Sequence, residues 1–580
     1  MWRSLAFRHF IGKLGRVRTF WASPIMRSRY LAATLAGLLL AVSFPKTGIA
    51  GLAWIAPALM LAAALGKGGW ESFRIGYVAG LAYYLASLYW LLLIPYRWHS
   101  IPLGPAAGWL SLSAYLALYP ATWVWFLSRI GNSKTGVPGA AEPAAFAPVY
   151  LNGVLARSWT QRTLWAFSGA ALWVALEMLV ARLFTGFPWN LLGASQYQMV
   201  PLIQIASVTG IYGVSFLIVW VSLSLLSAGL MVVLRPASRS GWVGEVILPA
   251  LVVALVFNFG LRQFTRESVP NRTLNIALIQ PSIPQTLIWD TSRDLDRFNE
   301  LIHLSEQALI NRPDLLVWPE AAVPSFARWN TNLYSAITNL VRQHHVWLIL
   351  GSDDLGRSAP PAPPDDYEYY NASFLVSPEG EFVSRYRKRK LVIFGEYVPL
   401  VRWLPFVKWF TPIDGGFTPG EHPVPFVLTR PGARISPLIC FEDTFPGAAR
   451  EAADDDLDFL VNLTNNGWFG ESAAQWQHAA SALFRAVENG LPLIRCSNNG
   501  LTAWVDAHGR LREVLRDSRG TIYGPGVLAA QIPLREPGQR HLSTFYHRHG
   551  DWFGWVCVGV SGSALLGRVL RWRSSKTAGA

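Results

Sequence analysis

Apolar positions follow two different patterns along this chain. In the first half they form long uncharged runs, whereas from about residue 272 short apolar runs alternate with amphipathic segments. A helix that crosses a membrane needs about 20 mostly apolar residues, so the longer runs qualify by themselves and the shorter ones with help from flanking residues. The pattern predicts eight membrane spans, seven of them before residue 270. The runs lie at residues 30–45, 51–65, 75–96, 105–128, 163–181, 207–234, 246–261 and 552–567.

The second pattern is typical of an α/β domain. Short runs rich in Val, Ile and Leu predict strands, and the segments between them have the apolar spacing of amphipathic helices. Two further turns, at residues 378–380 and 507–509, predict hairpins. The expected strands are residues 273–280, 314–320, 346–352, 435–441, 458–464 and 492–497, and the expected helices are residues 292–311, 331–345 and 473–489.

Composition agrees with a chain that lies partly in a membrane. Of its 580 residues, 52% are hydrophobic and only 15% are charged, while soluble domains have about 25% charged residues. The net charge of +14 does not indicate a nucleic-acid partner, because the basic residues gather in segments that the span count places on one side. Those segments, residues 1–29, 66–74, 129–162, 235–245 and 568–580, hold 19 Lys and Arg residues.

The distribution of basic residues also sets the orientation. The three short loops on the opposite side hold only Lys46, Arg97 and Arg182, as the positive-inside rule expects of non-cytoplasmic loops. Seven crossings then place the α/β domain outside the cytoplasm. The expected layout is a basic cytoplasmic N-terminus (1–29), a transmembrane domain (30–262), a periplasmic catalytic domain (270–545), a C-terminal transmembrane helix (552–570) and a cytoplasmic tail (571–580).

Three residue types in the α/β domain indicate thiol acyl chemistry. Glu320 ends a hydrophobic strand, Lys388 closes a hairpin, and Cys440 lies where another strand gives way to a helix. A thiol needs a base to accept its proton during attack, which a carboxylate supplies. An ammonium can then stabilise the oxyanion that develops. Taken singly, each residue also fits a structural role: a strand-end acid, one of five cations in RYRKRK, and a small buried hydrophobe.

The cysteines predict no disulfide framework, since there are only three in the chain. Cys557 lies in the last apolar run and fits a packing role. Cys440 and Cys496 share the outer domain, so a disulfide between them is an alternative to a free nucleophile. No metal or nucleotide motif accompanies them: His547 and His549 lack a third ligand at suitable spacing. We therefore expect no cofactor.

The motifs around these residues resemble the apolipoprotein N-acyltransferase family, a membrane-embedded branch of the nitrilase (carbon-nitrogen hydrolase) superfamily. The resemblance covers nearly the whole chain. In the membrane half it rests on residues 182–193 and 210–216. In the outer domain it rests on IPQTLIWD (283–290), WPEAAVP (318–324), YRKRKLVIFGEYVP (386–399), ICFED (439–443), NNGWFG (465–470), QWQH (475–478) and SNNG (497–500).

The resemblance implies a fold and a set of roles. The outer domain is expected to be an αββα sandwich, with Glu320 as base, Lys388 as oxyanion stabiliser and Cys440 as acyl acceptor. Glu396 matches a supporting carboxylate of the superfamily, and Glu442 matches an acid beside the nucleophile. A monomer is expected to suffice.

The implied reaction is a ping-pong transfer in a bacterial inner membrane. A phospholipid gives an acyl chain to the nucleophile, and the α-amine of an S-diacylglyceryl-cysteine at a lipoprotein N-terminus then takes it. Around the site, Trp289, Phe441, Trp468 and Phe469 are candidate substrate-contact or lid residues. The apolar, aromatic segment 401–418 has the character of a loop that rests at a membrane interface.

Some positions depart from the family pattern. Phe441 stands where Tyr is usual, Asn466 where Asp is usual, and Pro281 and Ser282 replace Gly and Asn. An arginine usual three residues after the acid Glu177 is absent. These departures leave the choice of acceptor open.

Glu177 is the one acid well inside an expected span. Such carboxylates face a partner or a cavity. We expect it either to pair with Arg182 or to fix helix packing through a polar contact, and favour packing.

Two rival functions remain at this stage. A membrane-tethered amidase would use the same triad with water as the second substrate, although one anchor would suffice for it. A lipid- or lipoprotein-binding module without activity would not need Glu320, Lys388 and Cys440 together.

Overall fold

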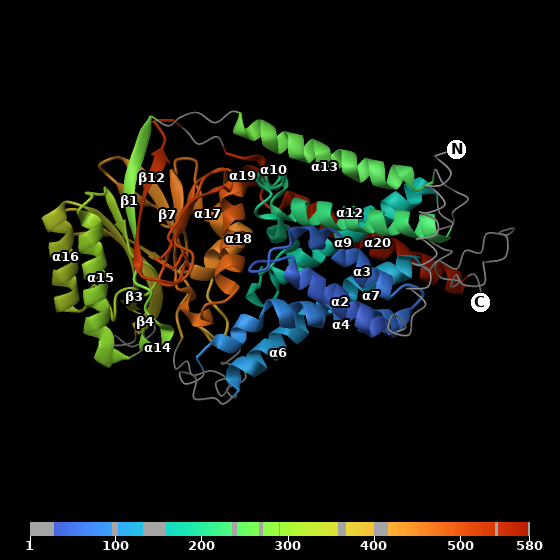
Figure 1. Ribbon diagram of the computed structural model, residues 1–580, viewed down its shortest axis with the longest axis horizontal. Helices are drawn as coiled ribbons and strands as arrows, with labels where there is room; N and C mark the ends of the chain where they lie inside the picture. Colours follow the sequence, from blue (N-terminus) through green and yellow to red (C-terminus); the bar gives the residue numbers. More distant parts are fainter. Residues whose placement is uncertain are drawn as a thin grey trace.

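The computed structural model describes residues 28–95, 103–131, 158–234, 241–265, 271–288, 290–357, 367–399, 416–536, 538–539 and 543–577. It has a bundle of apolar helices joined to a half built on two β-sheets (Figure 1). The helices come from the first half of the chain and from its last segment, and the sheets come from the residues between them. The change of apolar pattern near residue 272 coincides with the boundary between the two halves, since β1, the first strand, begins at Arg272.

Every predicted apolar run contains a helix. The helical half consists of α2 (Arg29–Val42), η1 (Ala50–Trp54), α3 (Ala56–Ala63), α4 (Gly69–Ser87), η2 (Tyr89–Leu93), α6 (Gly104–Leu116), α7 (Leu118–Gly131), α9 (Trp159–Val180), η3 (Leu183–Thr185), η4 (Leu192–Gln196), α10 (Val200–Ile203), α11 (Ala206–Thr209), α12 (Ile211–Leu234), α13 (Val243–Phe264) and α20 (Trp552–Thr577).

The number of eight spans is not confirmed. By length and composition, four helical segments among the described residues can cross a membrane: Gly104–Arg129, Trp159–Val180, Ile211–Leu234 and Val243–Phe264. Others fall short for identifiable reasons. The run 51–65 is divided between η1 and α3, and α4 carries Glu71 and Arg74 near its start. The helices nevertheless pack closely: a Cβ on Gly37 would lie 2.1 Å from the carbonyl oxygen of Ala79.

The second half contains two six-stranded sheets. One has the order β12-β1-β2-β3-β4-β5 and the other β11-β10-β9-β8-β7-β6, and in each the three parallel strands lie together. The strands are β1 (Arg272–Gln280), β2 (Leu315–Val317), β3 (Trp347–Arg357), β4 (Tyr367–Val376), β5 (Phe382–Arg387), β6 (Phe426–Leu428), β7 (Ala433–Ile439), β8 (Phe459–Thr464), β9 (Leu493–Ser497), β10 (Ala503–Val505), β11 (Leu511–Val514) and β12 (Gly526–Leu534).

The predicted helices and hairpins of this half are confirmed. α15 (Asp294–Leu309), α16 (Thr331–His344) and α18 (Ala474–Asn489) occupy the expected segments, and β4–β5 and β10–β11 are antiparallel pairs. Short helices α14 (Gln285–Ile288), α17 (Pro446–Ala452) and α19 (Phe545–His549) complete it. Two predicted strands are too long, since β2 ends at Val317 and β7 at Ile439. The residues beyond those ends, including Glu320 and Cys440, turn away from the sheets.

The two sheets face each other across an apolar core. Leu278 of β1 and Ile439 of β7 belong to this inner cluster, while Leu348 of β3 packs outward with α15 and α16. The other outer layer, α17 and α18, faces the helical half (Figure 1). Phe484 of α18 shares one continuous apolar cluster with Tyr212 of α12. The α/β half is thus an αββα sandwich whose second helical layer is packed against the membrane helices.

Candidate active site

Cys440 sits in a strained turn between β7 and a short 3-10 helix, η7 (Cys440–Thr444). Its φ is +51°, in the left-handed region that costs a residue with a Cβ about 1 kcal/mol or more. Two side chains hold the turn by its carbonyl oxygen: Asn462 Nδ2 donates to it at 3.0 Å, and His478 Nε2 lies 3.2 Å away. This geometry lifts a partly exposed thiol out of the end of the sheet.

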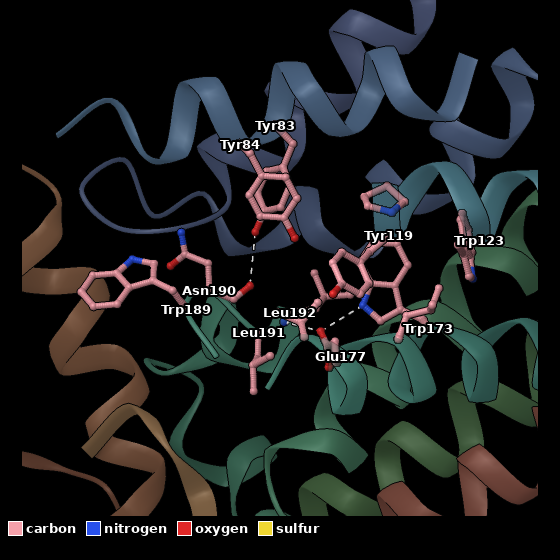
Figure 2. A pocket seen from close by; sticks show the side chains of 13 residues that line it. Tyr83, Tyr84, Tyr119, Trp123, Trp173, Glu177, Trp189, Asn190, Leu191 and Leu192 are labelled. Carbon is pink, nitrogen blue, oxygen red and sulfur yellow. Dashed lines mark hydrogen bonds between the residues drawn. The ribbon is translucent and has the colours of Figure 1, made fainter. Parts of the chain in front are cut away.

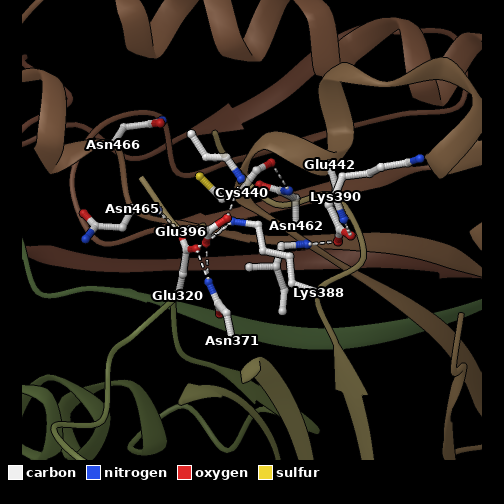
Figure 3. A network of polar contacts seen from close by, with 12 residues as sticks. Glu320, Asn371, Lys388, Lys390, Glu396, Cys440, Glu442, Asn462, Asn465 and Asn466 are labelled. Carbon is white, nitrogen blue, oxygen red and sulfur yellow. Dashed lines mark hydrogen bonds and ion pairs between the residues drawn. The ribbon is translucent and has the colours of Figure 1, made fainter. Parts of the chain in front are cut away.

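Glu320, Lys388 and Glu396 form one buried cluster (Figure 3). The ammonium of Lys388, 1% exposed, lies 2.7 Å from Glu396 Oε1 and 3.3 Å from Glu320 Oε1. Asn371 Nδ2 donates to the same two carboxylate oxygens, at 2.8 Å for Glu320 and 3.0 Å for Glu396. The sulfur of Cys440 lies beside this cluster. The structure thus brings four of the five polar residues singled out from the sequence to one place.

The protonation states follow from burial and charge. Burial alone would lower the pKa of Lys388, but the charges of Glu396 and Glu320 outweigh it and raise this pKa well above its usual value. Burial, followed by the charge of Glu320, raises the pKa of the Cys440 thiol to about 12, although Lys388 and the Thr464 hydroxyl oppose the change. The resting site therefore holds an ammonium and a neutral thiol, so the thiol needs a base at the moment of attack.

Glu320 is held in one orientation by three hydrogen-bond donors. Its Oε2 accepts a hydrogen bond from the backbone N–H of Asn465 at 2.9 Å, and its Oε1 is fixed by Asn371 and Lys388. The side chain is 7% exposed. Both oxygens are oriented by donors from separate elements, β4 and the segments that follow β5 and β8, which restricts the carboxylate to one geometry.

Glu442 occupies a different place from the one that its sequence position suggests. It is fully buried, and its carboxylate accepts hydrogen bonds from the Tyr386 hydroxyl and from the backbone N–H groups of Ile439, Arg389 and Lys390. Burial raises its pKa, which the hydrogen bonds partly offset. It therefore joins the turn of the nucleophile to the segment that carries Lys388.

A second polar network lies beneath the nucleophile. Asp443 accepts from His478 Nε2 at 2.6 Å and pairs with the buried Arg495, while His478 Nδ1 lies 3.1 Å from the Asn466 side chain. Burial lowers the pKa of His478. The Asn466 atom that faces Nδ1 is the amide oxygen Oδ1. Asn466, a departure from the family pattern, therefore belongs to the polar network beneath the nucleophile.

An aromatic seam runs between the nucleophile and the helical half. We define it as Trp90, Phe187, Trp189, Phe441 and Phe469. Phe441, next to the nucleophile, packs with ring centroids 5.9 Å from Phe187 and 6.1 Å from Trp189. Phe469 packs 4.5 Å from Trp90, which lies 5.1 Å from Trp189. Phe441 thus joins the turn of Cys440 to the aromatic rings of the helical half, and Phe469 packs on another part of the same seam.

Trp468 belongs to the same turn as Phe469, in η8 (Asn466–Phe469), and is half-buried. Trp289 and residues 400–415, most of the expected interface segment, lie outside the described residues. Their predicted roles stay predictions.

Beside the seam, a pocket inside the helical half contains Glu177 (Figure 2). Its lining includes Tyr84, Tyr119, Trp173 and Trp189. Glu177 Oε1 accepts from Trp173 Nε1 at 3.0 Å and from the backbone N–H of Leu192 at 2.7 Å.

Arg182 pairs with Asp551 instead of Glu177. Of the two roles predicted for Glu177, the structure agrees with the favoured one, in which its polar contacts fix helix packing.

All three cysteines are free thiols. The sulfur of Cys496 lies 3.3 Å from the carbonyl oxygens of Ile279 and Val317, where it packs in the core between the sheets.

Sequence reasoning missed three residues of the site. Asn371 and Asn462 lie inside strands β4 and β8, and their only signal was an amide within an otherwise apolar strand. Asp353 of β3 pairs in register with Asn371 and is close enough to Glu320 and Glu396 that burial, followed by their charges, raises its pKa to about 7.

The comparisons with known proteins cover both halves. The carbon-nitrogen hydrolase family matches residues 275–535, and the apolipoprotein N-acyltransferase N-terminal domain matches residues 36–224. The apolipoprotein N-acyltransferase of Geobacter metallireducens is 36% identical over 95% of this chain and 96% of its own. That of Rhizobium rhizogenes is 31% identical over 86% and 89%. An amidase from Nesterenkonia sp. AN1 aligns with 20% identity over 47% of this chain and 95% of its own, with a TM-score of 0.33.

Proposed function

Because the chain belongs to the apolipoprotein N-acyltransferase family, we propose that it transfers an acyl chain from a phospholipid to the α-amino group of a lipoprotein's N-terminal S-diacylglyceryl-cysteine. The acyl chain passes through a thioester on Cys440. The observation that carries the proposal is the position of this thiol, which lies beside a Glu-Lys cluster and next to Phe441, a member of the aromatic seam against the membrane helices.

In the first half of the reaction, Glu320 takes the proton of the Cys440 thiol as the sulfur attacks the ester carbonyl of the donor. The new C–S bond forms a tetrahedral intermediate, whose oxyanion the ammonium of Lys388 stabilises. When the ester C–O bond breaks, the protonated Glu320 gives its proton to the leaving alkoxide. A lysophospholipid departs, and the acyl chain stays on Cys440 as a thioester.

In the second half, the α-amine of the acceptor attacks the thioester. Glu320 accepts the proton of the amine, the C–S bond breaks, and the thiol is restored as the proton returns to sulfur. Glu396 and Asn371 keep Lys388 and Glu320 in place through both halves. The product is an amide, which is more stable than the thioester, so the transfer runs towards the lipoprotein.

The aromatic seam gives the donor a path. Phe441 and Phe469 pack against Trp90, Phe187 and Trp189, so the surface between the thiol and the helices is hydrocarbon-like. A lipid tail can lie there without desolvating polar groups. Half-buried Trp468 and Phe469 belong to the short turn that would move as a lid when a tail enters.

The same proposal includes a topology. We infer eight membrane spans, the shorter helices crossing with help from their flanking residues, in the inner membrane of a bacterium. The α/β half then lies on the periplasmic side, next to the outer leaflet that supplies the donor. This arrangement rests on the asymmetric distribution of Lys and Arg. A single chain contains every residue assigned above, so we propose that the monomer is sufficient.

The proposal is tested by isolating the intermediate. The purified protein is incubated with a phospholipid carrying a labelled acyl chain, and a hydroxylamine-labile adduct is expected on wild type and not on Cys440→Ala. Cys496→Ala is the matched control, since it removes a buried thiol outside the cluster, and it should still form the adduct. Absence of any adduct on wild type would refute the acyltransferase and favour a lipid-binding module.

The acceptor is tested in the same preparation. A diacylated lipopeptide with a free α-amine should accelerate the decay of the adduct and collect the label as an amide, whereas the N-acetylated peptide should do neither. If the adduct decays at one rate with both peptides, water is the second substrate and the chain is a membrane-tethered amidase.

A further inference from the structure

Gln477 of α18 is a buried amide whose hydrogen bonds all go to the other half of the molecule. It is 2% exposed. Its Oε1 accepts from Trp90 Nε1 at 3.0 Å and from Trp189 Nε1 at 2.9 Å. Its Nε2 donates to the carbonyl oxygens of Pro45 at 3.0 Å and Ser87 at 3.1 Å. Both donors and both acceptor positions of the amide are therefore used, by four separate points of the helical half.

The two indoles that Gln477 holds are members of the aromatic seam. Trp90 packs on Phe469, and Trp189 packs on Phe441, the residue after the nucleophile. Each indole can rotate about its side-chain bonds. The hydrogen bond from its Nε1–H to Gln477 Oε1 restricts that rotation. Gln477 thus fixes two rings that form the helical side of the seam.

The next residue of α18 faces the nucleophile itself. His478 Nε2 lies 3.2 Å from the carbonyl oxygen of Cys440 and 2.6 Å from Asp443. Two neighbouring side chains of one helix therefore contact the membrane half and the turn of the nucleophile. Because a helix is rigid over two residues, the position of the seam is tied to that of the thiol.

We propose that Gln477 is a positioning residue that keeps the aromatic seam in line with Cys440, so that a hydrocarbon chain arriving from the membrane presents its carbonyl group to the thiol. The inference rests on the proposed function, because it assigns Gln477 to the donor half of that reaction. The carbonyl group of a small water-soluble ester does not depend on the seam for its approach.

The chemistry at this position favours an amide over its isosteres. An apolar residue would leave two indole N–H groups and two backbone carbonyl groups buried without partners. A carboxylate would accept from both indoles but would set an oxygen against the carbonyls of Pro45 and Ser87. Only an amide supplies acceptors on one side and donors on the other.

The experiment compares two donors in Gln477→Leu. A labelled phospholipid in detergent micelles reports the lipid-dependent thioester, and the burst of p-nitrophenol from p-nitrophenyl acetate reports the reactivity of Cys440 towards a small ester. We expect the lipid-dependent rate to fall about 10- to 100-fold, since misplacement of a reacting group by about 1 Å has effects of this size. The small-ester burst should stay within about twofold of wild type.

The matched control is Gln280→Leu. Gln280 is also fully buried and hydrogen-bonded, to Ile522, Gly524 and Thr502, but all three partners belong to the α/β half. A loss of stability alone should change both donor rates in proportion in this variant. Gln477→Glu keeps the acceptors for both indoles, so its lipid-dependent rate should fall less than that of Gln477→Leu. If Gln477→Leu fails to fold, Gln477→Glu takes its place in the comparison of the two donors.

The outcomes separate the inference from the function beneath it. If wild type forms no lipid adduct, the proposed function fails. Wild type can form the adduct while the Gln477 variants either lower the rates with both donors in proportion or change neither rate. In both cases Gln477 is a structural residue only, and the inference is overturned. A selective loss with the lipid donor, absent in Gln280→Leu, supports it.

Discussion

Replacing Glu320 with Gln should slow acyl transfer while making Cys440 more reactive towards an alkylating agent. The two effects have opposite signs because the carboxylate does two things. It raises the pKa of the thiol through its negative charge, and in the proposed mechanism it is the base that the thiol needs during attack. The isosteric amide removes both, and its single oxygen can retain the hydrogen bond from Asn371 or that from Asn465, but not both.

The magnitudes follow from the charges. With a pKa of about 12, fewer than about one Cys440 in 10⁴ is a thiolate at pH 7.5. Removing one negative charge near the thiol changes this pKa by about one unit, the order expected for charges a few ångströms apart at an effective dielectric constant near 20. Alkylation should therefore accelerate about tenfold. Loss of a general base should lower the rate of thioester formation about 10²- to 10⁴-fold.

Iodoacetamide labelling between pH 7 and 10, read by mass spectrometry at Cys440, measures the first effect, and a labelled phospholipid measures the second. Cys440→Ala supplies the background of both assays. If the folded Glu320→Gln protein is alkylated more slowly than wild type, or forms the thioester at the wild-type rate, then Glu320 is neither the charge that opposes the thiolate nor its base.

Three further changes test other parts of the site. Lys388→Met removes the oxyanion's cation and leaves Glu320 and Glu396 facing each other, so thioester formation should fall about 10²- to 10³-fold; an unchanged adduct rate would exclude Lys388 from catalysis. Glu442→Gln breaks a buried carboxylate network and should lower stability by about 2–3 kcal/mol in a denaturation measurement, whereas a shift below 0.5 kcal/mol, roughly the size of a surface effect, would contradict this placement. Burial and its two acidic neighbours raise the pKa of Asp353 to about 7, so its stabilising contribution is present below about pH 4 and is lost as the pH rises through about 7. Asp353→Asn should therefore raise Tm at pH 8 but leave it unchanged near pH 4. Equal shifts of Tm at both pH values would count against this titration.

The sequence predicted residues whose position follows from a strand end. Lys388 and Cys440 come directly after β5 and β7, and Glu320 lies three residues after β2, while strand ends in α/β folds converge on one edge. Apolar runs likewise predicted the helices of the membrane half. They could not give the number of crossings, because breaks such as the one between α6 and α7 at Ala117 leave the length of a span undefined by composition.

The sequence could not predict residues whose contacts depend on how separate elements pack together. Asn371 reaches Glu320 only because β4 pairs with β3 and β5 in a particular register. Glu442 is adjacent to the nucleophile in sequence, yet its carboxylate turns to Tyr386 of β5. Gln477 depends on the docking of two halves that are encoded hundreds of residues apart. No local pattern of apolar and polar residues in the sequence indicates any of these contacts.

The charge of the site bears on the choice between an amine and water as second substrate. Two carboxylates, Glu320 and Glu396, face the single ammonium of Lys388, and the thiol beside them is neutral. Such a site attracts a cationic α-amine and repels hydroxide. The aromatic seam beside Cys440 adds a second bias, since it admits hydrocarbon more readily than water. In the proposed reaction, these two features favour transfer of the acyl chain to an amine over hydrolysis of the thioester.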